Sequence, residues 1–144
     1  MTACALFLVS LDILALQILQ TRIFSFTLWH HLAYMVITIA LMGMSAAGTW
    51  LATRRSEPQR PFKSLALYAL LLGVSTPLSL ATVTRIPLDT YMPNHMLQLA
   101  YVFLYYMALL FPYFFAGAVI SLLFRIQRER VNILYLVNLS LIHI

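Results

Sequence analysis

The sequence predicts an all-α fold, a polytopic membrane helix bundle of four transmembrane helices. Hydrophobic residues make up 62% of the chain and charged residues only 9%, whereas about 25% of a soluble domain is charged. The segments 32–52, 64–84 and 96–124 contain no charged residue, and 3–21 contains only Asp12. Each suits the roughly 20 residues that a helix needs to cross a membrane, and exceeds the roughly 10-residue strands of a membrane barrel.

The first two helices are expected at residues 3–26 and 32–52, joined by a tight turn in which Trp29 has the interfacial position typical of tryptophan. The polar segment 53–63 follows. Its sequence, TRRSEPQRPFK, contains two prolines. Because proline and polar residues interrupt helices, we expect a loop there.

The third helix is expected at residues 64–84, with a bend at Pro77. Proline removes a backbone donor and leaves a carbonyl without its partner. We expect nearby hydroxyl groups to bond to carbonyls freed in this way. The candidates are Ser75, Thr76, Ser79 and Thr82.

The fourth helix is expected at residues 96–124, after an outer loop at 85–95. At 1.5 Å per residue it would exceed about 40 Å, so it must tilt, kink at Pro112 or extend beyond the membrane. Its many aromatic residues would line an apolar, quinone-like pocket or, as is more common, contact lipid and the core.

We interpret residues 1–138 as a single transmembrane domain. The last residues, 139–144, read LSLIHI, which matches the translation of a commonly used transposon-derived sequencing adaptor. We expect this tail to be an artefact and the natural chain to continue past Asn138. The alternative is a genuine short hydrophobic tail.

The basic residues predict the topology. Of the nine Lys and Arg residues, all except Arg22 and Arg85 lie in 53–63 or after the fourth helix. Loops rich in Lys and Arg stay in the cytoplasm, so we expect a multi-pass protein of the bacterial inner membrane with both ends cytoplasmic. The 53–63 loop is expected to contact anionic lipid, through Arg54, Arg55, Arg60 and Lys63. No basic, aromatic-interleaved face indicates nucleic-acid binding.

The first helix and its turn form the most polar membrane segment and the candidate intramembrane site. The site consists of Asp12, Gln17, Gln20, Arg22, His30 and His31. An ionisable group such as Asp12 near a helix centre costs about 2.5–3.5 kcal/mol to insert. Asp12 is therefore either a ligand or proton site or a structural carboxyl that is hydrogen-bonded between helices.

Arg22 lies ten residues after Asp12, too far along one straight helix to pair with it. We expect its side chain to reach the outer interface. The more specific alternative is that it binds a phosphate headgroup there. The adjacent residues His30 and His31 lack the i, i+4 spacing of a helical metal site. We expect interfacial hydrogen bonds from them and no metal.

The segment 43–48, GMSAAG, resembles a degraded dinucleotide-binding motif. That motif requires a preceding strand and a soluble βαβ unit, whereas this one lies inside an uncharged helix. Small residues allow close approach of another helix. We therefore assign Gly43, Ala47 and Gly48 to helix packing.

No reaction can be read from these residues. Cys4 is the only cysteine, which excludes a thiolate cluster within this chain. We find no catalytic nucleophile, base and acid together, and no phosphate loop. We therefore expect no catalytic residue, metal or cofactor in this segment. Whether the parent protein is an enzyme stays open.

Residues 17–48 and 130–138 resemble a bacterial family of multi-span membrane proteins with a spermidine synthase-like domain. The matching positions are Leu16, Thr21, Arg22, Ile23, Ser25, Trp29, His31, Tyr34, Gly43 and Gly48. The segment 130–138, RVNILYLVN, is similar to the family motif that opens a fifth helix. Three positions depart from the pattern: Gln17 replaces a usual Glu, Ser45 a glycine, and Asn138 stands near the family's Asp.

This resemblance implies an N-terminal membrane domain that anchors a cytoplasmic aminopropyltransferase-like domain of the same chain. A further role would be to supply that domain with substrate. That domain would use an S-adenosyl-methionine-derived donor and lies outside these residues. Its partners would be the lipid bilayer and further transmembrane helices. Two alternatives remain: a transporter or channel-like bundle with Asp12 as an ion or proton site, and a purely structural membrane anchor.

Overall fold

The computed structural model describes residues 2–27, 30–54, 61–85 and 95–127, with Asn132, Tyr135 and Leu136. Four helices occupy these ranges: α1 (Thr2–Thr27), α2 (His30–Thr53), α3 (Pro61–Arg85) and α4 (His95–Ile126). All four are long and apolar enough to cross a membrane, and the described ranges contain no strand. The predicted fold class is confirmed.

Two helices begin earlier than the sequence predicted. His30 and His31 lie in the first turn of α2 rather than in the turn before it, and α3 begins at Pro61 rather than at Ser64. Proline suits the first turn of a helix, because an N–H there has no intrahelical acceptor and the fixed φ of proline is already helical. Trp29 and the tail 139–144 lie outside the described residues, and of the predicted fifth helix only Asn132, Tyr135 and Leu136 are described, all helical.

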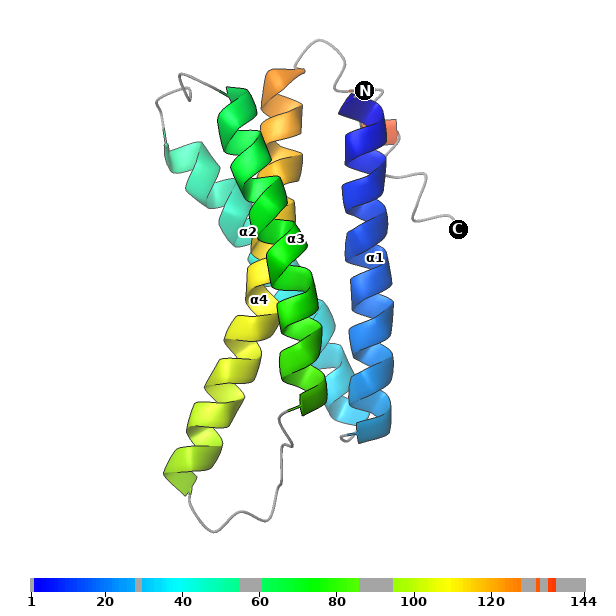
Figure 1. Ribbon diagram of the computed structural model, residues 1–144, viewed down its shortest axis with the longest axis vertical. Coiled ribbons are helices and arrows are strands. Elements are labelled where there is room, and N and C mark those ends of the chain that lie inside the picture. Colours follow the sequence, from blue (N-terminus) through cyan, green and yellow to red (C-terminus); the bar gives the residue numbers. More distant parts are fainter. Residues whose placement is uncertain are drawn as a thin grey trace.

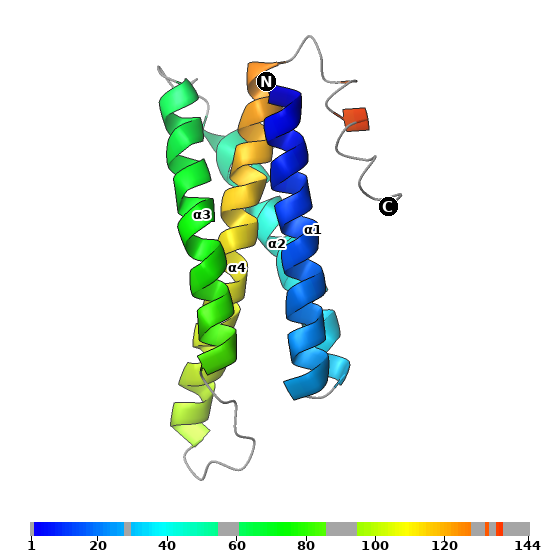
Figure 2. The same ribbon diagram turned by 45° about the vertical axis from the view of Figure 1, so that its right-hand side comes forward.

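The helices alternate in direction. The start of α1, the end of α2, the start of α3 and the end of α4 lie together at one end of the bundle (Figures 1 and 2). We call this the N-terminal end and the opposite one the distal end. The helix ends that flank the predicted cytoplasmic loop therefore lie at the same end of the bundle as the start of α1 and the end of α4. An even number of spans requires this arrangement.

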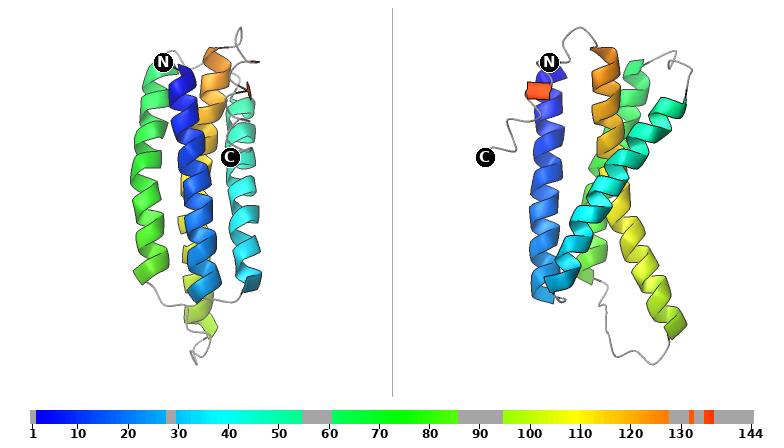
Figure 3. Two further views of the ribbon diagram at one scale, coloured as in Figure 1. Left: turned by 90° about the vertical axis from the view of Figure 1, so that its right-hand side faces the viewer. Right: turned by 180° about the vertical axis from the view of Figure 1, so that it is seen from behind.

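Helix α4 is the centre of the bundle. Half of its membrane-spanning window is buried (50%), against 28%, 33% and 17% for α1, α2 and α3. It crosses α2 (Figure 3), and its axis changes direction near the middle. Pro112, which is fully buried, occurs in this part of the sequence. A proline removes one intrahelical hydrogen bond and clashes with the preceding turn, which explains the bend.

The crossing of α2 and α4 depends on two glycines. A methyl group added to Gly117 would lie 2.8 Å from the Cα atom of Met44 and 3.2 Å from the Cβ atom of Ala47. One added to Gly43 would lie 3.0 Å from the Cβ atom of Tyr113. Because these neighbours are backbone or Cβ atoms, they cannot move out of the way as a flexible side chain can. The two helices approach at backbone distance, as small residues allow in membranes.

The other predicted packing glycine is less constrained. A methyl group on Gly48 would lie 3.9 Å from the Ser121 hydroxyl oxygen, an ordinary van der Waals contact. Ala47, by contrast, is completely buried. The close contact therefore involves Gly43 and Ala47 of the predicted set, together with Gly117 of α4, while Gly48 lies beside it.

Large apolar side chains are exposed on every helix. Examples are Ile18 on α1, Leu41 on α2, Leu70 on α3 and Leu99 on α4, all more than half exposed. An aqueous surface with apolar residues on all sides would aggregate. In a bilayer the same surface meets hydrocarbon, so these faces contact lipid.

Candidate functional site

The polar residues of α1 do not form one site. The structure separates them into a buried hydrogen-bond network around Gln20, a half-buried carboxyl at Asp12, and a groove that contains Gln17 and Arg22. At about 100° per residue, Gln20 and Arg22 project to nearly opposite sides of α1, and Asp12 and Gln17 lie on either side of Gln20. The helices that pack on each side then give these residues different environments.

Gln20 connects three helices. Its side-chain amide nitrogen donates to the Ser79 hydroxyl of α3 at 3.0 Å, and its carbonyl oxygen accepts a hydrogen bond from the Tyr113 hydroxyl of α4 at 2.6 Å. All three side chains are almost completely buried. In the described part of the chain, every buried side-chain nitrogen or oxygen has a hydrogen-bond partner. This network fixes α1 against α3 and α4, because breaking it would leave polar groups unpaired in an apolar interior.

Asp12 also faces α3. Its carboxyl group is within hydrogen-bonding reach of the Thr76 hydroxyl, which itself donates to the Leu72 carbonyl oxygen at 3.0 Å. The side chain is only partly buried. The Asp12 carboxyl group therefore lies near Thr76 of α3 and stays partly exposed.

The hydroxyl groups near Pro77 do not act as the sequence predicted. The carbonyl that this proline frees belongs to Gly73, four residues earlier. Ser75 and Thr76 both donate instead to the Leu72 carbonyl oxygen, and Thr82 donates to that of Leu78. Ser79 accepts from Gln20. The expectation was wrong because hydroxyl groups in a helix bond three or four residues back from their own position, wherever the proline lies.

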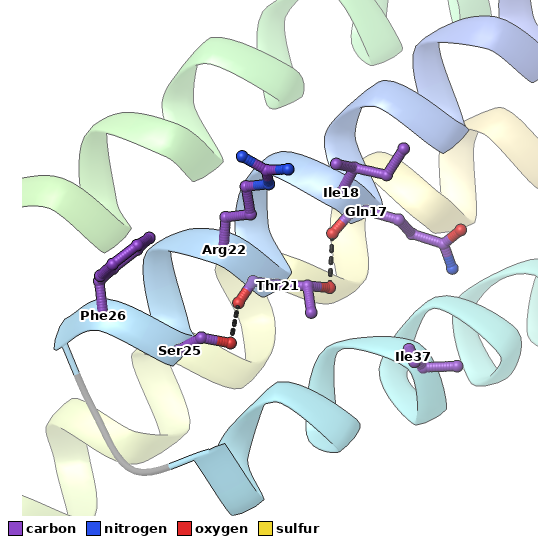
Figure 4. A pocket seen from close by; sticks show the side chains of 7 residues that line it. All are labelled: Gln17, Ile18, Thr21, Arg22, Ser25, Phe26 and Ile37. Atoms are coloured by element: carbon purple, nitrogen blue, oxygen red, sulfur yellow. Dashed lines mark hydrogen bonds between the residues drawn. The ribbon is translucent and has the colours of Figure 1, made fainter.

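A groove of about 630 Å³ lies along the distal half of α1. Its lining residues are Gln17, Ile18, Thr21, Arg22, Ser25 and Phe26 of α1 and Ile37 of α2. Figure 4 shows the side chains of Ile18, Arg22 and Phe26 on one side of α1, with Gln17, Thr21 and Ser25 on the other. The Thr21 and Ser25 hydroxyls donate to the carbonyl oxygens of Gln17 and Thr21, at 2.6 and 2.8 Å.

Arg22 is the only charged residue in this groove, and its side chain is exposed. Within the described part of the chain, no hydrogen bond or ion pair engages its guanidinium group. The groove thus contains an unpaired cation beside apolar side chains. An amphipathic anion can bind such a surface, because its charged group meets the cation and its apolar part meets the apolar side chains.

The predicted histidine pair contributes no described side chain. Only the backbone of His30 and His31 is described, in the first turn of α2. The described residues contain no group of three or more His, Cys, Asp or Glu that would hold a metal ion.

The basic residues at the N-terminal end have distinct contacts. The Arg54 guanidinium group stacks on the Trp50 ring at 4.7 Å from its centroid, and Lys63 is exposed in the first turn of α3. Arg55 and Arg60 lie outside the described residues. A contact that the sequence did not predict joins Arg125 of α4 to the Leu51 carbonyl oxygen at 2.5 Å. It caps the last turn of α2, where carbonyl groups lack helical donors.

An apolar pocket of about 500 Å³ lies between α3 and α4. Phe111 and Phe115, stacked with ring centroids 6.2 Å apart, contribute to its lining, and Ser75, Ser79 and Thr82 supply its polar atoms. The aromatic residues of α4 thus line a pocket and also contact the core.

Fold, composition and surface define the class: this is an α-helical membrane protein whose described residues form four helices long and apolar enough to cross a membrane. Comparison of the chain with protein-family models, with curated proteins and with solved structures finds no match.

Proposed function

We propose that the four helices form the membrane-embedded N-terminal domain of a spermidine synthase-like protein, and that the domain anchors a cytoplasmic catalytic domain of the same chain. The proposal has two separable parts. The first is the anchoring role, which rests on the structure. The second is the nature of the anchored domain, which rests on the sequence resemblance.

The anchoring role rests mainly on the way the bundle uses its polar groups. Gln20, Ser79 and Tyr113 satisfy one another inside the bundle, while large apolar side chains cover its outside. Such a bundle is held together across α1, α3 and α4 and has lipid as its solvent. Because the chain leaves α4 at the N-terminal end, a domain that follows would lie on the same side as the basic loop.

Several of the residues that carry the sequence resemblance also have structural roles in this bundle. Thr21, Arg22 and Ser25 all line the groove on α1, and Gly43 lies where α2 crosses α4. The resemblance remains the reason for proposing the S-adenosyl-methionine-derived donor.

The experiment recovers the reading frame beyond Asn138 and expresses the full-length protein in bacteria. Washing the membranes with alkaline carbonate tests anchoring, and binding of the S-adenosyl-methionine-derived donor to the washed membranes tests the catalytic domain. We expect the protein to resist the wash and to bind the donor. Release by carbonate would refute the anchor. A downstream frame without a glycine-rich nucleotide site would refute the spermidine synthase-like assignment alone.

A second candidate, a transporter or channel-like bundle, is favoured by one observation. Asp12 places a partly exposed carboxyl group on α1, near Thr76 of α3 and within the membrane span. If it carries an ion or proton, Asp12→Asn will abolish ion-coupled uptake into vesicles that contain the full-length protein, while Thr76→Val, which changes only its neighbour, will retain part of it. If wild-type vesicles show no ion-coupled uptake, the transporter candidate is refuted.

A further inference from the structure

The depth of Arg22 in the membrane is unfavourable for a lone charge. The α1 span covers Ala3–Phe26, so at 1.5 Å per residue Arg22 lies about 11 Å from its middle. The hydrocarbon core extends about 15 Å from the centre of the bilayer. The Arg22 backbone therefore lies about 4 Å inside the hydrocarbon boundary, and its guanidinium group must reach a polar partner beyond it.

A row of side chains on α1, apolar at both ends and charged in the middle, provides a surface for such a partner. Ile18, Arg22 and Phe26 follow one another at four-residue spacing along the same side of α1 (Figure 4). Ile18 is 59% exposed and Phe26 is 89% exposed. Ile18 lies deeper in the hydrocarbon than Arg22, and Phe26 lies at the interface. A lipid placed here would set its acyl chain along Ile18 and its phosphate group at Arg22.

Charge complementarity identifies the occupant. The guanidinium group is a planar donor that binds phosphate oxygens in a bidentate manner. The groove contains no carboxylate that would repel a phosphate. Because the Arg22 backbone lies about three-quarters of a helical turn below the interface, it also selects an anion that already lies in the membrane, which free phosphate in water does not.

We propose that the groove of α1 binds the phosphate group of an anionic phospholipid in the outer leaflet. Arg22 binds the phosphate, and Ile18 and Phe26 contact the acyl and glycerol portions. The site is independent of the anchoring proposal, because it requires only that α1 crosses the membrane with its start on the cytoplasmic side.

Native mass spectrometry of the full chain in detergent, with phosphatidylglycerol added, tests this site. The wild type is expected to retain one tightly bound phosphatidylglycerol molecule. Arg22→Gln should weaken retention about tenfold, the effect of losing one charge-assisted bond. Arg22→Lys, which retains the charge, should weaken it less.

Arg85→Gln is the matched control. Arg85 is the only other basic residue that the sequence assigns to the outer side, it is exposed in the last turn of α3, and it does not line the groove. This variant should retain lipid as the wild type does. Equal loss in both variants would show non-specific attraction to charge, and unchanged retention in Arg22→Gln would refute the site. Displacement of the lipid by inorganic phosphate would show a site for a free anion and overturn the assignment to lipid. Circular dichroism of each variant verifies that the helices are intact.

Discussion

Replacing Gly117 by alanine should destabilise the bundle, although alanine is the better helix former. The added carbon would lie 2.8 Å from the Met44 Cα atom and 3.0 Å from the Met44 carbonyl oxygen. Carbon atoms pack best at about 3.5–4.0 Å, so α2 and α4 would have to separate by roughly 1 Å. The second contact of the crossing, Gly43 against Tyr113, would loosen with them.

The magnitude follows from two opposing effects. Overpacking of a tight contact costs about 1–3 kcal/mol, whereas alanine gains up to about 1 kcal/mol over glycine in helix propensity. We therefore expect Gly117→Ala to lose up to about 2 kcal/mol relative to the wild type, and to be about 1–3 kcal/mol less stable than alanine variants at unconstrained glycines. The chain offers two control glycines: Gly48, where a methyl group would meet only Ser121 Oγ at 3.9 Å, and Gly73, where it would meet nothing within 4 Å.

The assay is unfolding in mixed micelles by increasing SDS, followed by circular dichroism and reported as a free energy of unfolding. Gly117→Ala should be less stable than the wild type, while Gly48→Ala and Gly73→Ala should be as stable or slightly more so. If Gly117→Ala matches the two controls, α2 and α4 do not approach at backbone distance, and our account of the crossing is wrong.

Three further predictions each concern one polar side chain of the bundle. Tyr113→Phe removes the 2.6 Å hydrogen bond to Gln20 and should lower the free energy of unfolding in the SDS titration by about 0.6–1.7 kcal/mol. Tyr106→Phe, at an exposed site, should cause no measurable change. Equal losses of stability in the two variants would argue against the network. Arg125→Gln removes the cap on the Leu51 carbonyl and should increase hydrogen exchange in the last turn of α2, and unchanged exchange would count against the cap. Asp12→Asn should leave membrane insertion unchanged by carbonate extraction, since it retains the size of the side chain and removes only a potential charge; failure to insert would mean that the carboxyl itself is needed for assembly.

The existence and order of the four helices could be predicted because charge and hydropathy are properties of the chain alone. Three uncharged segments and a fourth with only Asp12 leave few other folds. The helix ends were less accurate. Pro61 was read as part of a loop, although proline is as compatible with a first helical turn as with a loop.

The division of the polar residues of α1 could not be predicted. Gln17, Gln20 and Arg22 lie within two turns of one helix, and their environments depend on which helices pack on each side. Gln20 is buried because Ser79 and Tyr113, 59 and 93 residues away in sequence, supply its partners. The signal for Gly117 was present in the small residues of the segment 116–118, AGA, by the same reasoning that had identified Gly43 and Ala47.

Sided labelling of single cysteines tests the central claim, that four helices cross a bilayer with the start of α1 and the end of α4 on the same side. In a Cys4→Ser background, a cysteine is placed in the second connection by Ser56→Cys or in the third by Asn94→Cys. Intact cells are treated with a membrane-impermeant maleimide. We predict that Asn94→Cys is labelled in intact cells and Ser56→Cys only after the membrane is permeabilised. Labelling of both positions in intact cells, or recovery of the chain as a soluble monodisperse protein without detergent, would contradict the account.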